Sequence, residues 1–322
     1  MFKNLMVYRV GAEWQPTVSQ IEQELAKGLF VPCGATQAQS LGWVPPRGVA
    51  HGALVESIDG KHGPHWLIKL QIEQRVLPGS VVRERADELA AQVEQATGRK
   101  PGKKAMKDLK EQATHELLPL AFTKTAAIRV WIAPALHLMM IDAGSPKRAE
   151  EVVSLLVKAL DGLSLHLIQT AESPATCMSA WLQDGVPPEG FSIDRDCELK
   201  SPDEMKSVVR YARHALDIEE VRQHLLAGKL PTRLAMSWRD RVSFVLTDTL
   251  AIKKIAFLDL AFEGRDAPSK DEAFDADVAL ATGELGQLIP ALIDGLGGEH
   301  DFFAPAAAAL AEPVLETAEA PW

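Results

Sequence analysis

Residues 81–122 read VVRERADELAAQVEQATGRKPGKKAMKDLKEQATHELLPLAF and contain two apolar stripes at helical spacing. The first stripe consists of Val82, Ala86, Leu89, Val93 and Ala96, and the second of Met106, Leu109, Ala113 and Leu117. Alternating steps of three and four residues are typical of a helix that packs on another helix. A Pro-Gly turn separates the stripes. They therefore predict an αα-hairpin, an arm roughly 28 Å long at about 1.5 Å per residue.

The turn and the second helix carry a concentration of positive charge. Residues 99–110 contain six basic residues and one acid, Asp108, in a chain whose formal net charge is −10. The six are Arg99, Lys100, Lys103, Lys104, Lys107 and Lys110. Lys103, Lys107 and Lys110 recur at the spacing of one helix face, about a quarter turn from the apolar stripe. The second helix can therefore pack on the first and still present ammonium groups, and the alternative is an ordinary solvated face.

Length and composition bound the remaining possibilities. A chain of 322 residues is long enough for two or three subdomains. Its three cysteines, Cys33, Cys177 and Cys197, form no CxxC pattern, which disfavours a disulfide framework or a zinc site and indicates a reducing cytoplasm. The most apolar stretch, residues 126–141, is interrupted by an arginine and a proline, so we expect no membrane span. The negative net charge permits a local nucleic-acid site, because phosphates respond to the nearby field.

Elsewhere the pattern predicts antiparallel strands and capped helices. The first half is expected to contain strands at 2–10 and 66–76, a helix at 17–27, a hairpin across Pro134, and a helix at 147–160 capped by Ser145-Pro146. The second half is expected to contain a hairpin at 241–258, a strand at 277–281 and a helix at 282–293. A hairpin followed by a capped helix, at 129–160 and again at 241–293, suggests an internal structural duplication.

These elements indicate an α+β fold with mainly antiparallel sheets, packed helices and a projecting two-helix arm. We expect a first α+β sheet subdomain at 1–77 with 125–165, the helical-hairpin arm at 78–124, a second α+β subdomain at 166–298, and an acidic, alanine-rich tail at 299–322. The tail has five acids and neither lysine nor arginine. We expect this tail to be disordered.

Searches for catalytic patterns give weak candidates. Gly228-Lys229 lacks the rest of a phosphate-binding NTPase loop, and GxSxG, HExxH and GxGxxG are absent. Cys33 has no histidine or basic residue close in sequence to activate it. The histidines His51, His62 and His65 could ligate a metal, but a loop around Gly63-Pro64 explains them more simply. Clustered acids could bind Mg²⁺ in a nuclease, and the candidates are Asp259, Asp275, Asp277 and Glu284.

Several long blocks resemble the RdgC family of bacterial recombination-associated proteins. They are FKNLMVYR, PCG followed by GWVPP, LIKLQIEQRVLPGSVV, ELLPLAF, TRLAMSW, FDADVALATGEL and LIDGLGGE, in this order over residues 2–299. The resemblance implies a homodimeric ring, closed by two different two-fold contacts, around double-stranded DNA bound with little sequence preference. It also implies restraint of recombinase filaments, no cofactor and no catalysis. The location expected from it is the cytoplasm, in association with the nucleoid.

The resemblance also assigns residues to the closing contacts of the ring. Phe122 in LLPLAF corresponds to an aromatic residue at one contact, and Arg213-His214 aligns with a basic-polar pair at the same gate. A ring that reads no base edges needs only phosphate-directed cations. Besides the six basic residues of the arm, weaker candidates for the lining are Arg129, Lys147, Arg148, Arg210, Arg239, Lys253 and Lys254.

Three hypotheses therefore compete. The first is a non-enzymatic duplex-binding ring that modulates a recombinase. The second is a metal-dependent nuclease that uses Asp275, Asp277 and Glu284. The third is a protein-interaction module whose acidic surface imitates DNA, and it predicts recombinase inhibition without any DNA binding.

Overall fold

The structure, a computed structural model, describes residues 2–60, 63–263 and 272–300. Within these ranges twelve strands form one sheet, and neighbouring strands pair antiparallel throughout. The order is β2-β4-β5-β6-β1-β12-β11-β10-β8-β9, with β3 on β4 and β7 on β1. The strands are β1 Leu5–Val10, β2 Gln39–Val44, β3 Glu56–Gly60, β4 Gly63–Arg75, β5 Thr123–Ala133, β6 Leu138–Asp142, β7 Leu165–Leu167, β8 Phe191–Lys200, β9 Val208–Tyr211, β10 Leu230–Trp238, β11 Val242–Thr247 and β12 Ile252–Phe257. The prediction of an α+β fold with mainly antiparallel strands is confirmed.

Seven α-helices accompany the sheet in the described residues. They are α1 Val18–Ala26, α2 Gly79–Thr97, α3 Lys103–Leu117, α4 Pro146–Ala159, α5 Pro174–Asp184, α6 Glu219–Leu226 and α7 Ala273–Gly295. Helix α1 begins with a capping box in which the side chains of Thr17 and Gln20 bond reciprocally to backbone amides. Helix α4 begins at Pro146, one residue before the predicted start at Lys147, and the Ser145 side chain makes no capping hydrogen bond. The proline supplies the start instead, because its fixed φ suits the first helical position.

Two hydrophobic cores lie on opposite faces of the sheet, and β1 contributes to both. Leu5 and Val7 belong to the core that includes α5, α6 and α7, whereas Met6 and Tyr8 belong to the core that includes α1 and α4. Successive side chains of a strand point to opposite faces, so this alternation is the expected result. Strand β1 is thus a central strand of one continuous sheet that the two halves of the chain share.

The two halves of the sheet meet where β1 pairs with β12. This pairing has one register position, Leu5 opposite Ile252. Two further contacts extend it, because the amide of Ile255 donates to the carbonyl of Lys3 at 3.0 Å and the amide of Lys254 donates to Asn4 Oδ1 at 3.4 Å. We call this junction the seam. The proposed subdomain boundaries and the internal duplication stay predictions.

Helix α7 corrects the prediction for residues 277–293. The expected strand at 277–281 and the expected helix start at Thr282 are both wrong, because one helix runs through Ala273–Gly295. Its buried residues Val278, Ala281 and Leu285 recur at steps of three and four. Thr282 does not cap a helix, since its hydroxyl donates to the carbonyl of Val278 at 2.9 Å. Helix α7 is long and apolar enough to span a membrane, but 61% of that window is buried inside the protein, as in a core helix.

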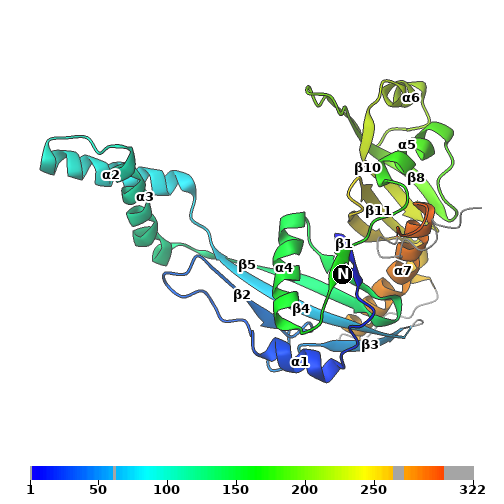
Figure 1. The fold of residues 1–322 in the computed structure, drawn as a ribbon, viewed down its shortest axis with the longest axis horizontal. Helices are drawn as coiled ribbons and strands as arrows, with labels where there is room; N and C mark the ends of the chain where they lie inside the picture. The colour runs from blue at the N-terminus through cyan, green and yellow to red at the C-terminus, as the bar shows by residue number, and fades with distance from the viewer. Residues whose placement is uncertain (1, 61–62, 264–271, 301–322) are drawn as a thin grey trace, which may run out of the picture.

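The arm projects from one end of the sheet, and the region of α5, α6 and β8 rises at the opposite end on the same side, which gives the molecule a crescent shape (Figure 1). Helices α2 and α3 do pack together, but Figure 1 shows them crossing rather than lying side by side along their whole length. Their shared core contains Ala86, Leu89 and Ala113. Val93 and Ala96, at the far end of the predicted stripe, are exposed. The predicted stripe is therefore an interhelical contact only in its first half.

Two further expectations need correction. His65 does not lie in a loop, since it is a buried residue of β4 whose Nδ1 accepts a hydrogen bond from Trp131 Nε1 at 3.2 Å. His62 lies outside the described residues. The chain also remains ordered past the predicted start of the tail, because Glu299 forms a bridge with Thr170. The rest of the predicted disordered tail, residues 301–322, lies outside the described residues.

Candidate nucleic-acid interface

The base of the arm is fastened to the sheet by Arg75 at the end of β4. Its Nε and Nη2 donate to the carbonyl of Gly34 at 3.3 and 3.2 Å, and its Nη1 donates to the carbonyl of Ala121 at 3.0 Å. The amide of Val76 donates to the carbonyl of Phe122 at 2.8 Å. These bonds connect the segment that enters the arm with the segment that leaves it, and they give the arm a defined origin. The sequence reasoning missed Arg75, because its partners are backbone carbonyls of distant loops.

The two arm helices are also linked by an ion-pair bridge. Arg85 on α2 donates from Nε to Glu116 on α3 at 2.9 Å and from Nη1 to Glu88 at 2.9 Å. Hydrogen bonds from Gln112 and Arg85 hold the pKa of Glu116 below its usual range. The bridge is exposed, so it orients the helices more than it stabilises them.

The outer part of the arm carries the six cations predicted from the sequence, which we call the arm-tip cations. They are Arg99, Lys100, Lys103, Lys104, Lys107 and Lys110, and all are exposed. In the described part of the chain, Lys107 is the one member within 4.0 Å of a carboxylate, that of Glu111. Helix α3 begins at Lys103 with no acid in its first turn, so the positive end of the helix dipole adds to the lysine charges. Such a surface attracts anions such as phosphates.

A second cationic group lies along the seam. Lys253 Nζ donates to the carbonyl of Gly144, just before α4, at 3.4 Å. This contact brings β12 next to the first turn of α4, which carries Lys147. The seam cations are Lys3, Lys147, Arg148, Lys253 and Lys254. Arg148 is paired with Glu151 at 2.7 Å. Lys3 was not predicted, because only the pairing of β1 with β12 brings the first residues beside residue 254.

Arg129 belongs to a third location, on the sheet itself. It lies directly opposite Lys69 in the pairing of β4 with β5. Burial, and secondarily the charge of Arg129, lower the pKa of Lys69. Lys69 was missed because a single lysine in an alternating strand is unremarkable until its cross-strand neighbour is known.

Two of the predicted cations of the second half, Arg210 and Arg239, are engaged with nearby side chains. Arg210 Nε donates to Glu198 at 2.6 Å, and the Arg239 guanidinium lies 4.6 Å from the ring centroid of Trp238. Arg210 is therefore a weak candidate for phosphate binding. The structure thus distributes the predicted cations over the arm, the seam, the sheet and the far end of the crescent rather than gathering them in one site.

The residues assigned to the closing contacts are at the surface. Phe122 is 88% exposed and Leu120, two residues before it, is 78% exposed. Arg213 and His214 are also exposed, and they follow β9 in the half of the crescent opposite the arm. Contiguous exposed apolar patches mark surfaces that bind another protein, and Leu120 adds to the apolar area that Phe122 exposes. Leu120 was not predicted, although it lies in the same LLPLAF block.

The acids proposed for a nuclease site are separated by their partners. Asp275 pairs with Arg47 at 2.5 Å, and Glu284 accepts two hydrogen bonds from Arg241 Nε at 2.9 Å. Asp277 is exposed, on the same helix as both. Within the described ranges, no group of three or more histidine, cysteine, aspartate or glutamate side chains is arranged to hold a metal ion.

Cys33 is in an environment that disfavours its reactive form. Its amide donates to Glu73 Oε2 at 2.6 Å and its thiol donates to the Glu73 carbonyl at 3.3 Å. Burial and the Glu73 carboxylate raise the pKa of the Cys33 thiol. A raised pKa lowers the thiolate fraction near neutral pH, so a nucleophilic role is disfavoured.

Comparison with known proteins gives a consistent result along the chain. A family model described as "Putative exonuclease, RdgC" matches residues 1–299. A protein of Dechloromonas aromatica (strain RCB), named "Recombination-associated protein RdgC", is 46% identical over 303 residues, covering 92% of this chain and 98% of that protein. Proteins of the same name from Herminiimonas arsenicoxydans and Bordetella pertussis (strain Tohama I) are 45% and 43% identical, covering 93% and 92% of this chain and 98% of each relative.

Proposed function

The chain belongs to the RdgC family of recombination-associated proteins, and from that premise we propose that it binds double-stranded DNA without sequence preference. In this proposal it acts as a ring-shaped homodimer, in the cytoplasm and associated with the nucleoid, and it restrains a recombinase without catalysing a reaction.

The observation that carries this proposal is the group of arm-tip cations. Six exposed basic residues occur within twelve positions of a chain whose net charge is −10. A solvated helix face would need no such excess of positive charge. The cations at the start of α3 also interact unfavourably with the positive end of the helix dipole. Bound phosphates would offset both the repulsion among these cations and their unfavourable interaction with the helix dipole. Lysine and arginine that contact phosphates position DNA but read no sequence, which is why we propose binding without sequence preference.

The experiment is fluorescence anisotropy with three unrelated duplexes of equal length. The variant Lys103→Glu/Lys107→Glu/Lys110→Glu should bind all three at least about tenfold more weakly, and equally so. The matched control is Lys27→Glu/Lys158→Glu/Lys206→Glu, which changes the net charge by the same amount at exposed lysines outside the arm. Equal losses in both variants would mean that total charge, rather than the arm, controls binding.

The proposal of a ring depends on exposed residues in the two halves of the crescent. Phe122 and Leu120 expose an apolar surface at the base of the arm, and Arg213-His214 lies in the opposite half. In a two-fold dimer Phe122 of one protomer would then meet Arg213-His214 of its partner at the one gate that the resemblance assigns to both. The two halves of the crescent would then enclose the DNA.

Restraint of the recombinase would follow from occupation of DNA. A ring on the duplex would compete with the recombinase for the DNA backbone and would not need to contact the recombinase itself. In this case inhibition should disappear when naked duplex is added in excess. Inhibition that persists would favour the hypothesis of a direct protein contact.

The description of the matching family also names exonuclease activity. The described carboxylates do not favour it, since Asp275 and Glu284 are paired with different arginines. Incubation of the purified protein with labelled duplex and Mg²⁺ tests this directly. We expect the duplex to remain intact, and cleavage that Asp275→Ala abolishes would reject the non-enzymatic proposal.

A further inference from the structure

A groove of about 400 Å³ lies between the C-terminal ends of α1 and α4. Its lining includes Trp43 of β2 and Leu70 of β4, which are directly opposite each other in the strand pairing. Both belong to the core that includes α1 and α4, so the groove opens on that face of the sheet. We call it the Trp43–Leu70 groove. Its volume falls within the range of ligand sites, about 300 to 1,000 Å³.

The apolar surface continues from the groove along the end of the sheet, where β2 is the last strand. Leu41 also lines the groove and is 36% exposed. It lies two residues before Trp43 on β2 and therefore on the same face. Leu29 is 54% exposed and forms a parallel bridge with Trp43. Contiguous exposed apolar side chains mark surfaces that bind another protein. This surface is longer than the groove, which favours a chain segment over a small molecule.

A glycine leaves room for an incoming side chain beside the indole of Trp43. Gly28, just after α1, lines the groove. A Cβ atom at this position would lie 3.4 Å from Trp43 Cδ1 and 3.6 Å from Trp43 Nε1, which is ordinary van der Waals contact. Any larger side chain at position 28 would therefore occupy the groove itself. With glycine there, this edge of the indole can contact an apolar group that enters from outside.

The groove also has a positive charge balance, in contrast to the chain as a whole. Two lysines and one glutamate line it, a local balance of +1 in a chain whose net charge is −10. Lys27 lies on the wall formed by α1 and Lys158 on the wall formed by α4. Lys27 pairs with Glu24 at 2.5 Å, but its side chain is 70% exposed, so the pair is weak. Lys158 is exposed. Both ammonium groups are therefore accessible to carboxylates of a partner.

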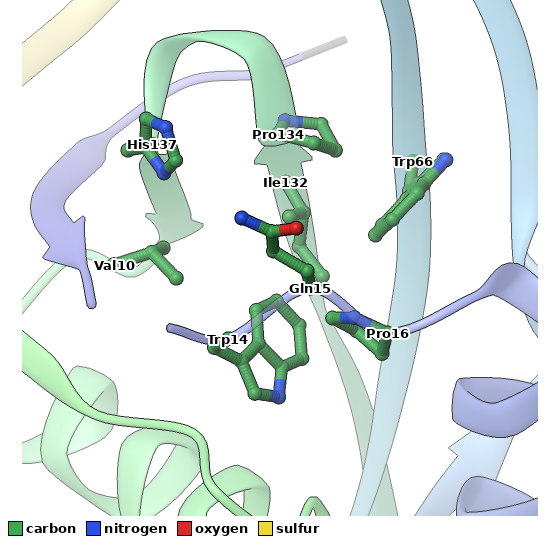
Figure 2. A pocket seen from close by; sticks show the side chains of 8 residues that line it. All are labelled: Val10, Trp14, Gln15, Pro16, Trp66, Ile132, Pro134 and His137. Carbon is green, nitrogen blue, oxygen red and sulfur yellow. The ribbon is translucent and has the colours of Figure 1, made fainter. Parts of the chain in front are cut away.

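The pocket beside the turn between β5 and β6 offers a contrast on the same face of the sheet (Figure 2). It has a volume of about 270 Å³, and Trp14 and Trp66 are among the residues that line it. None of its described lining residues is a lysine or an arginine. This pocket has the apolar character of the groove without its cations, and it serves as an internal control.

We propose that the Trp43–Leu70 groove binds an acidic segment of a partner protein, in which a large apolar side chain is flanked by aspartate or glutamate. The apolar side chain enters between α1 and α4 and packs on Trp43, and the flanking carboxylates pair with Lys27 and Lys158. In such recognition the apolar anchor supplies affinity, and the charges select the partner. This inference goes beyond the proposed function and does not depend on DNA binding.

The test is fluorescence anisotropy of the full chain with three labelled peptides, whose sequences are DDFLDD, KKFLKK and DDSSDD. DDFLDD should bind at least about tenfold more tightly than either of the others, because it alone combines the apolar anchor with the acids. Nonspecific attraction to a chain of net charge −10 would favour KKFLKK instead. Equal affinities for DDFLDD and DDSSDD, or tighter binding of KKFLKK, would overturn the proposal.

Charge reversal assigns the binding to the groove. Lys27→Glu/Lys158→Glu should weaken the binding of DDFLDD at least about tenfold and leave duplex affinity unchanged. The control Lys103→Glu/Lys110→Glu, on the arm, changes the net charge equally and should have the opposite effects. Unchanged affinity for DDFLDD in Lys27→Glu/Lys158→Glu would contradict the proposal, whatever the result with duplexes.

A second pair of variants fills the two cavities of this face. Gly28→Leu should weaken the binding of DDFLDD because its side chain occupies the space beside Trp43. Gln15→Phe, which fills the pocket shown in Figure 2, should not change it. Equal affinities in these two variants would contradict the proposed site. Sedimentation velocity of Lys27→Glu/Lys158→Glu tests whether a second copy occupies the groove, and weaker self-association would overturn the assignment to a partner protein.

Discussion

At the scale of single residues, the three thiols are distinguished by their surroundings. Burial, and secondarily the Glu198 charge, raise the pKa of Cys197 to about 12, whereas burial and Glu172 raise that of Cys177 to about 11. Cys33 is the most accessible of the three. Both buried thiols are therefore expected to remain protonated and unreactive at neutral pH.

The raised pKa of Cys197 predicts a loss of stability in alkali. Its folded pKa is above the ordinary value of 9.0, so its contribution is complete below pH 9 and is lost as the pH rises from 9 toward 12. Between pH 8 and 10 the expected loss is about 1.4 kcal/mol. Urea unfolding at both pH values should show a smaller decrease for Cys197→Ala than for the wild type. Equal decreases in the two proteins would contradict the assignment.

Phe122 carries the prediction for self-association. If its ring is buried between protomers, Phe122→Ala should weaken that contact by about 2 kcal/mol, or roughly thirtyfold in its dissociation constant. Sedimentation velocity over a dilution series measures this effect. The control is Phe262→Ala, which removes a ring that is 49% exposed. An unchanged dissociation constant for Phe122→Ala would reject Phe122 as a closing residue.

At the scale of elements, Ala113 determines how closely the arm helices approach each other. It is fully buried between α2 and α3, where it meets Ala86 and Leu89. Ala113→Leu should therefore force the helices apart, at a cost of about 1–3 kcal/mol. Hydrogen exchange should accelerate in α2 and α3 and stay constant in β4 and β5. Ala105→Leu, at an exposed position of α3, is the control, and equal exchange in both variants would contradict this packing.

The elements also show what a single sequence can predict. Periodicity located α1, α4, both arm helices and the strands on either side of Pro134, because each has a regular apolar pattern. The same reasoning failed at α7, where Thr282-Gly283-Glu284 imitates a helix start. This helix is apolar on most of its surface, so its sequence lacks the contrast between an apolar and a polar face that identifies a helix and shows where it begins.

Of the candidate site, the sequence predicted the cations that lie on one helix but missed those that strand pairing brings together. Exposed cations on one helix are visible in the sequence, and all six arm-tip cations are indeed exposed. Arg210 is a counterexample, because its partner Glu198 is on another strand. Lys69 opposite Arg129 and the seam cations depend in the same way on strand pairing. Where tertiary contacts neutralise charges or bring them together, the result can be predicted only once the fold is known.

At the scale of the whole molecule, one continuous sheet supports both halves of the crescent. Strand β1 is buried in both cores, so the seam cannot open without exposing apolar side chains on both faces. This continuity favours a rigid frame on which the arm and the opposite end keep a constant separation. A rigid frame is what the proposed ring around a duplex would require.

The most direct measurement is the dependence of duplex affinity on salt for the full-length protein. Each phosphate contact contributes about 0.9 to the magnitude of the log–log slope. Lys103→Glu/Lys107→Glu/Lys110→Glu should therefore reduce the slope by about 2.7 if each lysine contacts one phosphate, while Lys27→Glu/Lys158→Glu/Lys206→Glu should leave it near the wild-type value. The same slope in all three proteins would contradict the claim that the arm binds the DNA backbone.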